Sequence, residues 1–137
     1  MNNSEENIYA RDKAIRYIGI SKKTEYEVVK KLKGLKVASS VIEQEIEYLK
    51  ELGFIDDVDY VKSYIKQCEK MLNYSVYEIT NKLLQKGIKA GIIEQEIQVL
   101  KETDYEDKVI DRLMHGKLKS YDEMKQKNYL YRRGFRV

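Results

Sequence analysis

Few side chains in this chain of 137 residues could do chemistry. His115 is the only histidine and Cys68 the only cysteine, which excludes a histidine-based triad, a multi-histidine metal site and an internal disulfide. Cys68 follows the apolar spacing of a helix, which predicts a core thiol rather than a nucleophile. The acidic run Asp56, Asp57 and Asp59 could bind a cation, but such carboxylates more often cap a helix. We therefore expect no enzyme, no metal and no cofactor.

Lysine and arginine side chains form the larger candidate site. The net charge is only +3, yet residues 22–36 hold six lysines against two glutamates, and the last 13 residues hold five basic residues and no acidic one. A basic face on helices can bind phosphates or an acidic protein groove. Alternatively, the lysines only solvate the helices and complement their dipoles. The candidate contact residues are Lys30, Lys31, Lys33, Lys82, Lys86, Lys89, Lys125, Lys127, Arg132, Arg133 and Arg136.

Twelve of the fourteen aromatic residues are tyrosines. A tyrosine beside a cation can stack on a nucleic-acid base, whereas a tyrosine at helical spacing more often lies at the edge of a core. We expect core-edge positions for Tyr26, Tyr64 and Tyr77. Tyr129 and Tyr131, which neighbour two arginines, are the better candidates for stacking.

The elements that position these side chains are predicted to be helices. Proline is absent, and apolar residues recur at spacings of three and four, as in Val61, Ile65 and Cys68. The string IEQEI occupies 42–46 and again 93–97, and residues 26–51 match 77–102 at 12 of 26 positions. This is an internal duplication. A fainter third copy is indicated because KLLQKGI at 82–88 resembles YLYRRGF at 129–135.

The duplication predicts an all-α fold made of three-helix repeats in tandem. The first repeat, 1–56, has helices at 7–19, 24–34 and 38–52, and the second, 57–103, has helices at 57–73, 75–86 and 89–102. The third, 104–137, has helices at 104–115 and 120–133 and lacks the last helix of the unit. Because one triplet cannot hide its apolar face alone, we expect the repeats to stack into an elongated, curved array.

Capping residues are predicted at the helix ends. N-caps for the second helix of each repeat are Ser21 or Thr24, Ser75 and Ser120. The expected left-handed residues at the ends of these helices are Gly34, Gly87 and Gly134. In the junction LGFIDD at 52–57, we expect Gly53 to close the first repeat, Phe54 and Ile55 to be buried, and Asp56 or Asp57 to cap the next helix.

The sequence also indicates where the protein works. No apolar run approaches the ~18 residues that a membrane span needs, and the N-terminal MNNSEENIYARDK has no apolar leader segment. A single cysteine is typical of a reducing compartment. We expect a cytoplasmic protein without membrane contact, and a monomer.

Several of these motifs follow one another along the chain in an order typical of one protein family. A Tyr-Glu pair at 26–27, LGFIDD followed by Tyr60, Ser63 and Tyr64, a KGI turn at 86–88 and a terminal RRGF at 132–135 together resemble the RecX family of bacterial recombination regulators. The resemblance runs from about Ala14 to Phe135. Two features depart from the family pattern. The 51-residue shift places Lys36 where the second repeat has a glycine, and we expect Gly34 to take that part after a two-residue gap. The third repeat lacks a helix that longer members possess.

The resemblance implies a partner and a function. Members of the RecX family bind the RecA filament on single-stranded DNA, lie in its helical groove and inhibit its ATPase, strand-exchange and co-protease activities, so that DNA repair and the SOS response are modulated. The basic face would then meet DNA phosphates or an acidic RecA surface. The alternatives are a nucleic-acid-binding helical module that acts alone and a protein-binding scaffold.

Overall fold

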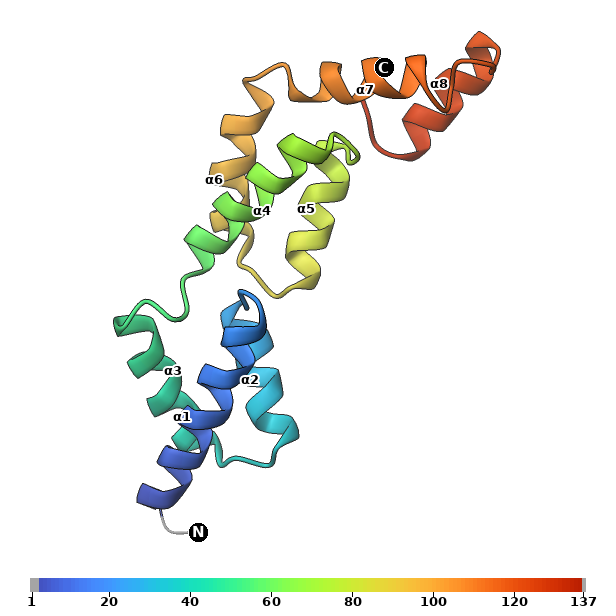
Figure 1. Cartoon of the computed structure of the whole chain (residues 1–137). Helices are drawn as coiled ribbons and strands as arrows, with labels where there is room; N and C mark the ends of the chain where they lie inside the picture. The colour runs from blue at the N-terminus through green and yellow to red at the C-terminus, as the bar shows by residue number, and fades with distance from the viewer. Residues whose placement is uncertain (1–2, 137) are drawn as a thin grey trace. The chain divides into compact units, whose positions relative to one another are not determined.

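The computed structural model describes residues 3–136, and in that range every regular element is an α-helix (Figure 1). All eight predicted helices are present, with ends that differ from the predicted ones by at most four residues. They are α1 (Asn3–Ile20), α2 (Glu25–Gly34), α3 (Ser39–Glu51), α4 (Asp57–Met71), α5 (Val76–Gln85), α6 (Ala90–Lys101), α7 (Tyr105–His115) and α8 (Glu123–Arg132). Residues 1–2 and 137, which the predicted first and third repeats include, lie outside the described residues.

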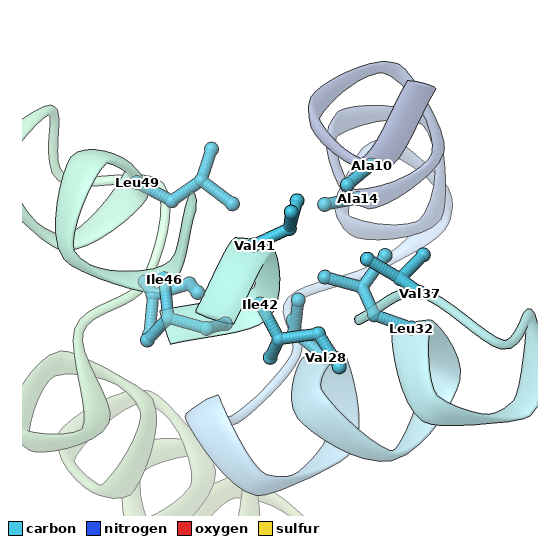
Figure 2. Packing of buried hydrophobic residues seen from close by; sticks show 10 residues of the cluster. Ala10, Ala14, Val28, Leu32, Val37, Val41, Ile42, Ile46 and Leu49 are labelled. Carbon is cyan, nitrogen blue, oxygen red and sulfur yellow. The ribbon is translucent and has the colours of Figure 1, made fainter. Parts of the chain in front are cut away.

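The chain divides into two compact units. The first runs to Tyr60 and also includes Lys86–Ile88. In it, α1, α2 and α3 each pack against the other two. Their core, drawn in Figure 2, consists of Ala10, Ala14, Val28, Leu32, Val37, Val41, Ile42, Ile46, Leu49 and Ile55. The two alanines lie on the side of α1 that faces the other helices, so the short side chains let the helices approach closely.

The second unit comprises Val61–Gln85 and the residues from Lys89 onward. Within it, α5 packs against α6, and α6 contacts α7. Its buried side chains include Val61, Ile65 and Cys68, whose spacing predicted a helix. Further buried side chains of this unit are Val76, Ile79, Leu83, Ile93, Ile97, Leu100, Tyr105, Val109, Leu118, Leu130 and Phe135.

The junction at 52–57 differs from its prediction at one residue. Gly53 has a positive φ of 80° and Ile55 is 3% exposed, as expected, but Phe54 is 42% exposed. The N–H groups of Phe54 and Ile55 both donate to the carbonyl of Leu49, at 2.9 and 3.3 Å, and this tight turn directs only the second side chain inward. Asp56 caps α4 by accepting from the N–H of Asp59 at 3.0 Å.

Two predicted caps are wrong. Ser120 does not begin α8; Asp122 does, since its carboxylate accepts from the N–H of Lys125 at 2.8 Å. Gly34 lies inside α2, and the left-handed residue after that helix is Lys36, with φ 64°. The 51-residue shift therefore needs no gap, because Lys36 takes the same conformation as Gly87 in the second repeat, whose φ is 79°.

Candidate binding surface

The structure separates the eleven candidate basic residues into two groups. Lys82, Lys86 and Arg133 are half-buried. The exposed ones are Lys30, Lys31, Lys33, Lys89, Lys125, Lys127, Arg132 and Arg136. The half-buried residues have internal partners that explain their position, so the two groups are described in turn.

Lys86 belongs to a contact at the start of α2 that joins residues distant in sequence. The fully buried Thr24 is the N-cap: its hydroxyl accepts from the N–H of Glu27 at 3.2 Å and donates to the carbonyl of Lys86 at 2.7 Å. The Glu27 carboxylate lies 3.9 Å from the Lys86 ammonium. The Tyr26 ring presses on Gly87, where a Cβ would come within 2.2 Å of the ring's Cγ.

The same contact recurs at the start of α5, with Arg133 as the basic residue. The hydroxyl of buried Ser75 accepts from the N–H of Glu78 at 3.1 Å and donates to the carbonyl of Arg133 at 2.6 Å. The Glu78 carboxylate pairs with the Arg133 guanidinium at 2.9 Å. Tyr77 presses on Gly134, where a Cβ would lie 2.7 Å from the tyrosine side chain. We call this arrangement the docking motif: a hydroxyl N-cap, a tyrosine and a glutamate that together hold a basic-glycine turn.

The docking motif explains why a lysine is tolerated at position 36. Glycine is needed at 87 and 134 for two reasons: the backbone has a positive φ, and a tyrosine side chain lies where a Cβ would be. Only the first of these conditions holds at Lys36, and its side chain is exposed. The sequence signal for the motif was present in the repeated Tyr-Glu pairs and basic-glycine turns, but nothing in the sequence indicated that one binds the other.

A pH dependence follows from the second docking motif. Burial alone would raise the pKa of Glu78, but hydrogen bonds from Arg133 and from the Ser75 N–H, with the arginine charge, lower it below its ordinary value of 4.5. A carboxylate whose pKa is lower in the folded state stabilises the fold above its ordinary pKa, and that stabilisation is lost as the pH falls through the lowered one. Glu78→Gln should therefore cost about 1–2 kcal/mol at neutral pH.

Urea unfolding of wild type and Glu78→Gln at neutral pH and at about pH 3 measures this effect. The difference in unfolding free energy between the two proteins should shrink at the acid pH, where the wild-type carboxylate is increasingly protonated. An equal difference at both pH values would show that the carboxylate charge does not contribute.

The exposed basic residues differ in how far they are engaged. Lys31 lies over the ring of Tyr17 at 5.4 Å, and Lys125 over the ring of Tyr121 at 4.2 Å. Lys127 forms an exposed ion pair with Glu123 at 3.2 Å. On α2, Lys30 and Lys33 are three residues apart and therefore neighbours on one exposed face.

The second repeat does not continue this face. The 51-residue shift places Asn81 and Leu84 of α5 where α2 has Lys30 and Lys33. Lys82 of α5 is half-buried and lies over the ring of Tyr74 at 4.6 Å.

The two tyrosines that we singled out for stacking differ in exposure. Tyr129 is half-buried, its hydroxyl accepts from Arg133 at 3.1 Å, and Lys117 lies over its ring at 4.9 Å. Tyr131 is 77% exposed. Tyr131 is therefore the stacking candidate that solvent reaches.

Acidic residues on the third helices also divide by burial. Glu43 and Glu47 are exposed, whereas Glu45 is 1% exposed and accepts from both Arg11 Nε at 2.8 Å and Arg11 Nη2 at 3.1 Å. The corresponding pair in the second repeat is Lys62–Glu96, which is longer, at 3.9 Å, and has a 61% exposed lysine side chain.

The residues first considered for chemistry have structural surroundings. Burial raises the pKa of the Cys68 thiol to about 11, so the thiol stays protonated at neutral pH. His115 is exposed, with its ring nitrogen 3.3 Å from the Asp111 carboxylate. Asp57 accepts from the N–H of Glu25 at 3.0 Å, at the start of α2. Among residues 3–136 no cluster of metal-ligand side chains is found, and no helix is long and apolar enough to cross a membrane.

Comparison with known proteins gives matches in sequence. Residues 10–49 match the model described as RecX, first three-helix domain. Regulatory protein RecX of Streptococcus agalactiae serotype III (strain NEM316) is 38% identical over 105 residues, which are 77% of this chain and 41% of that protein. Regulatory protein RecX of Clostridium botulinum (strain Eklund 17B / Type B) is 34% identical over 136 residues, 95% of this chain and 62% of that protein. The chain thus spans about two fifths to three fifths of the length of these relatives.

Solved structures match in fold. The crystal structure of RecX from Lactobacillus salivarius superposes with a TM-score of 0.81 over 98% of this chain and 91% of that one, at 22% identity. A second crystal structure, of a regulatory protein RecX, gives a TM-score of 0.85 over 98% of this chain and 70% of that one, also at 22% identity. The helical arrangement found here is therefore one that these proteins share.

Proposed function

Because the chain belongs to the RecX family, we propose that it is a regulatory protein that binds the RecA filament on single-stranded DNA and inhibits the filament's ATPase, recombinase and co-protease activities. The observation that carries the proposal is the sequence similarity to proteins named regulatory protein RecX, which extends over 95% of the chain in the Clostridium botulinum relative. We further propose that it acts in the cytoplasm as a monomer and needs no active site.

The exposed lysines of α2 are the part of the proposed interface best suited to a test. Lys30 and Lys33 are exposed neighbours, so changing them should leave the core intact. Arg133 is a poor probe, because its ion pair with Glu78 and its place in the docking motif mean that its loss would disturb the fold.

Titration of the protein into a RecA ATPase assay on single-stranded DNA tests the proposed function. We expect the wild type to inhibit ATP hydrolysis, and Lys30→Glu/Lys33→Glu to raise the half-inhibitory concentration about tenfold, because two attractive charges become repulsive. The matched control is Glu43→Lys/Glu47→Lys, which changes two exposed residues of α3 in the same unit and should not weaken inhibition.

Two outcomes would contradict these expectations. Folded wild-type protein that leaves ATP hydrolysis unchanged at saturation would overturn the proposed function. Equal effects of the two double variants would mean that the α2 lysines are only solvated surface.

A further inference from the structure

The C-terminal part of the chain carries the excess positive charge. Between Gly116 and Arg136 there are seven basic and two acidic residues, which leaves 19 basic and 21 acidic residues elsewhere. Without this segment the chain would be slightly acidic. A charge concentrated in one segment attracts a polyanion at short range, whereas the net charge of +3 spread over the chain would not.

The two acidic residues of the segment are already engaged. Asp122 accepts from the N–H of Lys125 at 2.8 Å as the N-cap of α8, and Glu123 pairs with Lys127 at 3.2 Å. The Glu123–Lys127 pair is exposed on both sides, and such pairs are weak and easily exchanged for another anion. Arg132 is exposed at the end of α8.

Helix α8 is drawn in red in Figure 1. One face of this helix combines these cations with an exposed aromatic ring. At helical spacing, Lys127, Asn128 and Tyr131 are neighbours, and Arg132 follows at the edge of the same face. Tyr131 is 77% exposed and Met124, one turn before Asn128, is 74% exposed. An exposed ring flanked by cations offers a platform on which a nucleic-acid base can stack.

A depression at the first turns of α8 adds a shape to this chemistry. It has a volume of about 490 Å³ and is lined by Asp122, Glu123, Met124, Lys127 and Asn128. The side chain of Met124 gives it an apolar wall and Asn128 an amide that can donate and accept hydrogen bonds. The amide and the apolar wall suit an unpaired base. Tyr131, Lys127 and Arg132 on the same face of α8 suit stacking and phosphate contact.

The start of α8 also differs from the starts of α2 and α5, which carry the docking motif. The positions that hold Thr24, Tyr26 and Glu27 in α2 correspond to Asp122, Met124 and Lys125 in α8, so the hydroxyl, the ring and the carboxylate of the docking motif are all replaced. The glutamate has become a lysine, which reverses the charge that binds a basic-glycine turn.

From these observations we propose that α8 binds single-stranded DNA, with Tyr131 stacking on a base and Lys127 and Arg132 contacting phosphates. The proposal rests on the proposed function only for its setting, a filament assembled on single-stranded DNA; the binding itself requires no RecA. An acidic protein surface would use the same cations, but it would not need the Tyr131 ring.

The test is fluorescence anisotropy of a labelled oligo(dT) of about 20 nucleotides, without RecA, at several salt concentrations. We expect Tyr131→Ala to weaken binding about 5- to 10-fold and Tyr131→Phe to retain it, because the ring and not the hydroxyl stacks. Arg132→Glu should weaken binding and make the salt dependence shallower by about one counterion. The matched control, Lys66→Glu, removes an exposed lysine on α4 and should have a much smaller effect.

Contrary results are equally definite. The proposal is overturned if the wild type does not bind oligo(dT), if Tyr131→Ala binds like wild type, or if polyglutamate competes as well as unlabelled oligo(dT). The RecA assay separates this proposal from the proposed function. A wild type that binds oligo(dT) through Tyr131 but leaves RecA unaffected supports the α8 site and refutes the RecA function; inhibition of RecA without binding to oligo(dT) does the reverse.

Discussion

Gly87→Ala is expected to destabilise the protein by about 2–4 kcal/mol. About 1 kcal/mol comes from placing a residue with a Cβ at φ 79°. A further 1–3 kcal/mol, roughly, comes from a collision, because the alanine Cβ would lie 2.2 Å from Cγ of the Tyr26 ring. Urea unfolding followed by circular dichroism measures the loss as a lower transition midpoint at unchanged slope.

Gly53 provides a matched control for this change. Its φ of 80° is the same within a degree, but a Cβ there would meet no atom within 4 Å. Gly53→Ala should therefore cost only the conformational part, about 1 kcal/mol. In addition, Tyr26→Ala should reduce the cost of Gly87→Ala, since the collision partner is gone. Equal costs at Gly53 and Gly87 would refute the role that we assign to the ring.

Arg11→Met is expected to cost about 1–3 kcal/mol, because it leaves the Glu45 carboxylate buried with only part of its hydrogen bonds. Glu45 is 1% exposed, and after the change Asn7, at 2.9 Å, is the side-chain donor that remains to it among residues 3–136. The loss is limited because Arg11 itself is 40% exposed, so water can reach the vacated position. The contact of the guanidinium with the Tyr48 ring, at 3.7 Å, is lost as well.

Lys62→Met is the internal comparison, since Lys62–Glu96 occupies the same place in the second repeat. That pair is longer and more exposed, so its loss should cost at most about 1 kcal/mol. Arg11→Met/Glu45→Gln should recover part of the stability by removing the unpaired charge. If Arg11→Met and Lys62→Met lower the unfolding free energy equally, the burial of Glu45 does not determine the strength of the Arg11–Glu45 pair.

Much of the fold could be predicted from the sequence because the helices are short, periodic and repeated. The second helices were located by their caps, and Thr24 and Ser75 are indeed N-caps of the type in which a glutamate three residues on bonds back. The errors fall where two local signals compete. The sequence analysis predicted Ser120 as the cap of the last helix, but Asp122, two residues later, is also a capping residue type and begins α8. Phe54 and Ile55 were both predicted to be buried, but the tight turn buries only Ile55.

The candidate site was harder to predict because composition does not reveal which cations are engaged. Lys86 and Arg133 lie in the turns that follow α5 and α8, and each pairs with a glutamate more than fifty residues away. Such contacts depend on tertiary packing and leave no local pattern. Tyr129 and Tyr131 are two residues apart and so point to different sides of α8, but only the structure says which side is covered.

The hydrogen bond from Thr24 to Lys86 has a consequence for the order of events during synthesis. The bond spans 62 residues, and Lys86–Ile88 belong to the first unit although they follow the whole of α4 and α5. When the ribosome has released only α1, α2 and α3, the Thr24 hydroxyl and the Tyr26 ring still lack Lys86 and Gly87, the residues they contact. The first unit therefore completes its packing only after most of the second repeat has been translated. A pause in translation between α3 and Lys86 would prolong the time for which the start of α2 is exposed to proteases and chaperones.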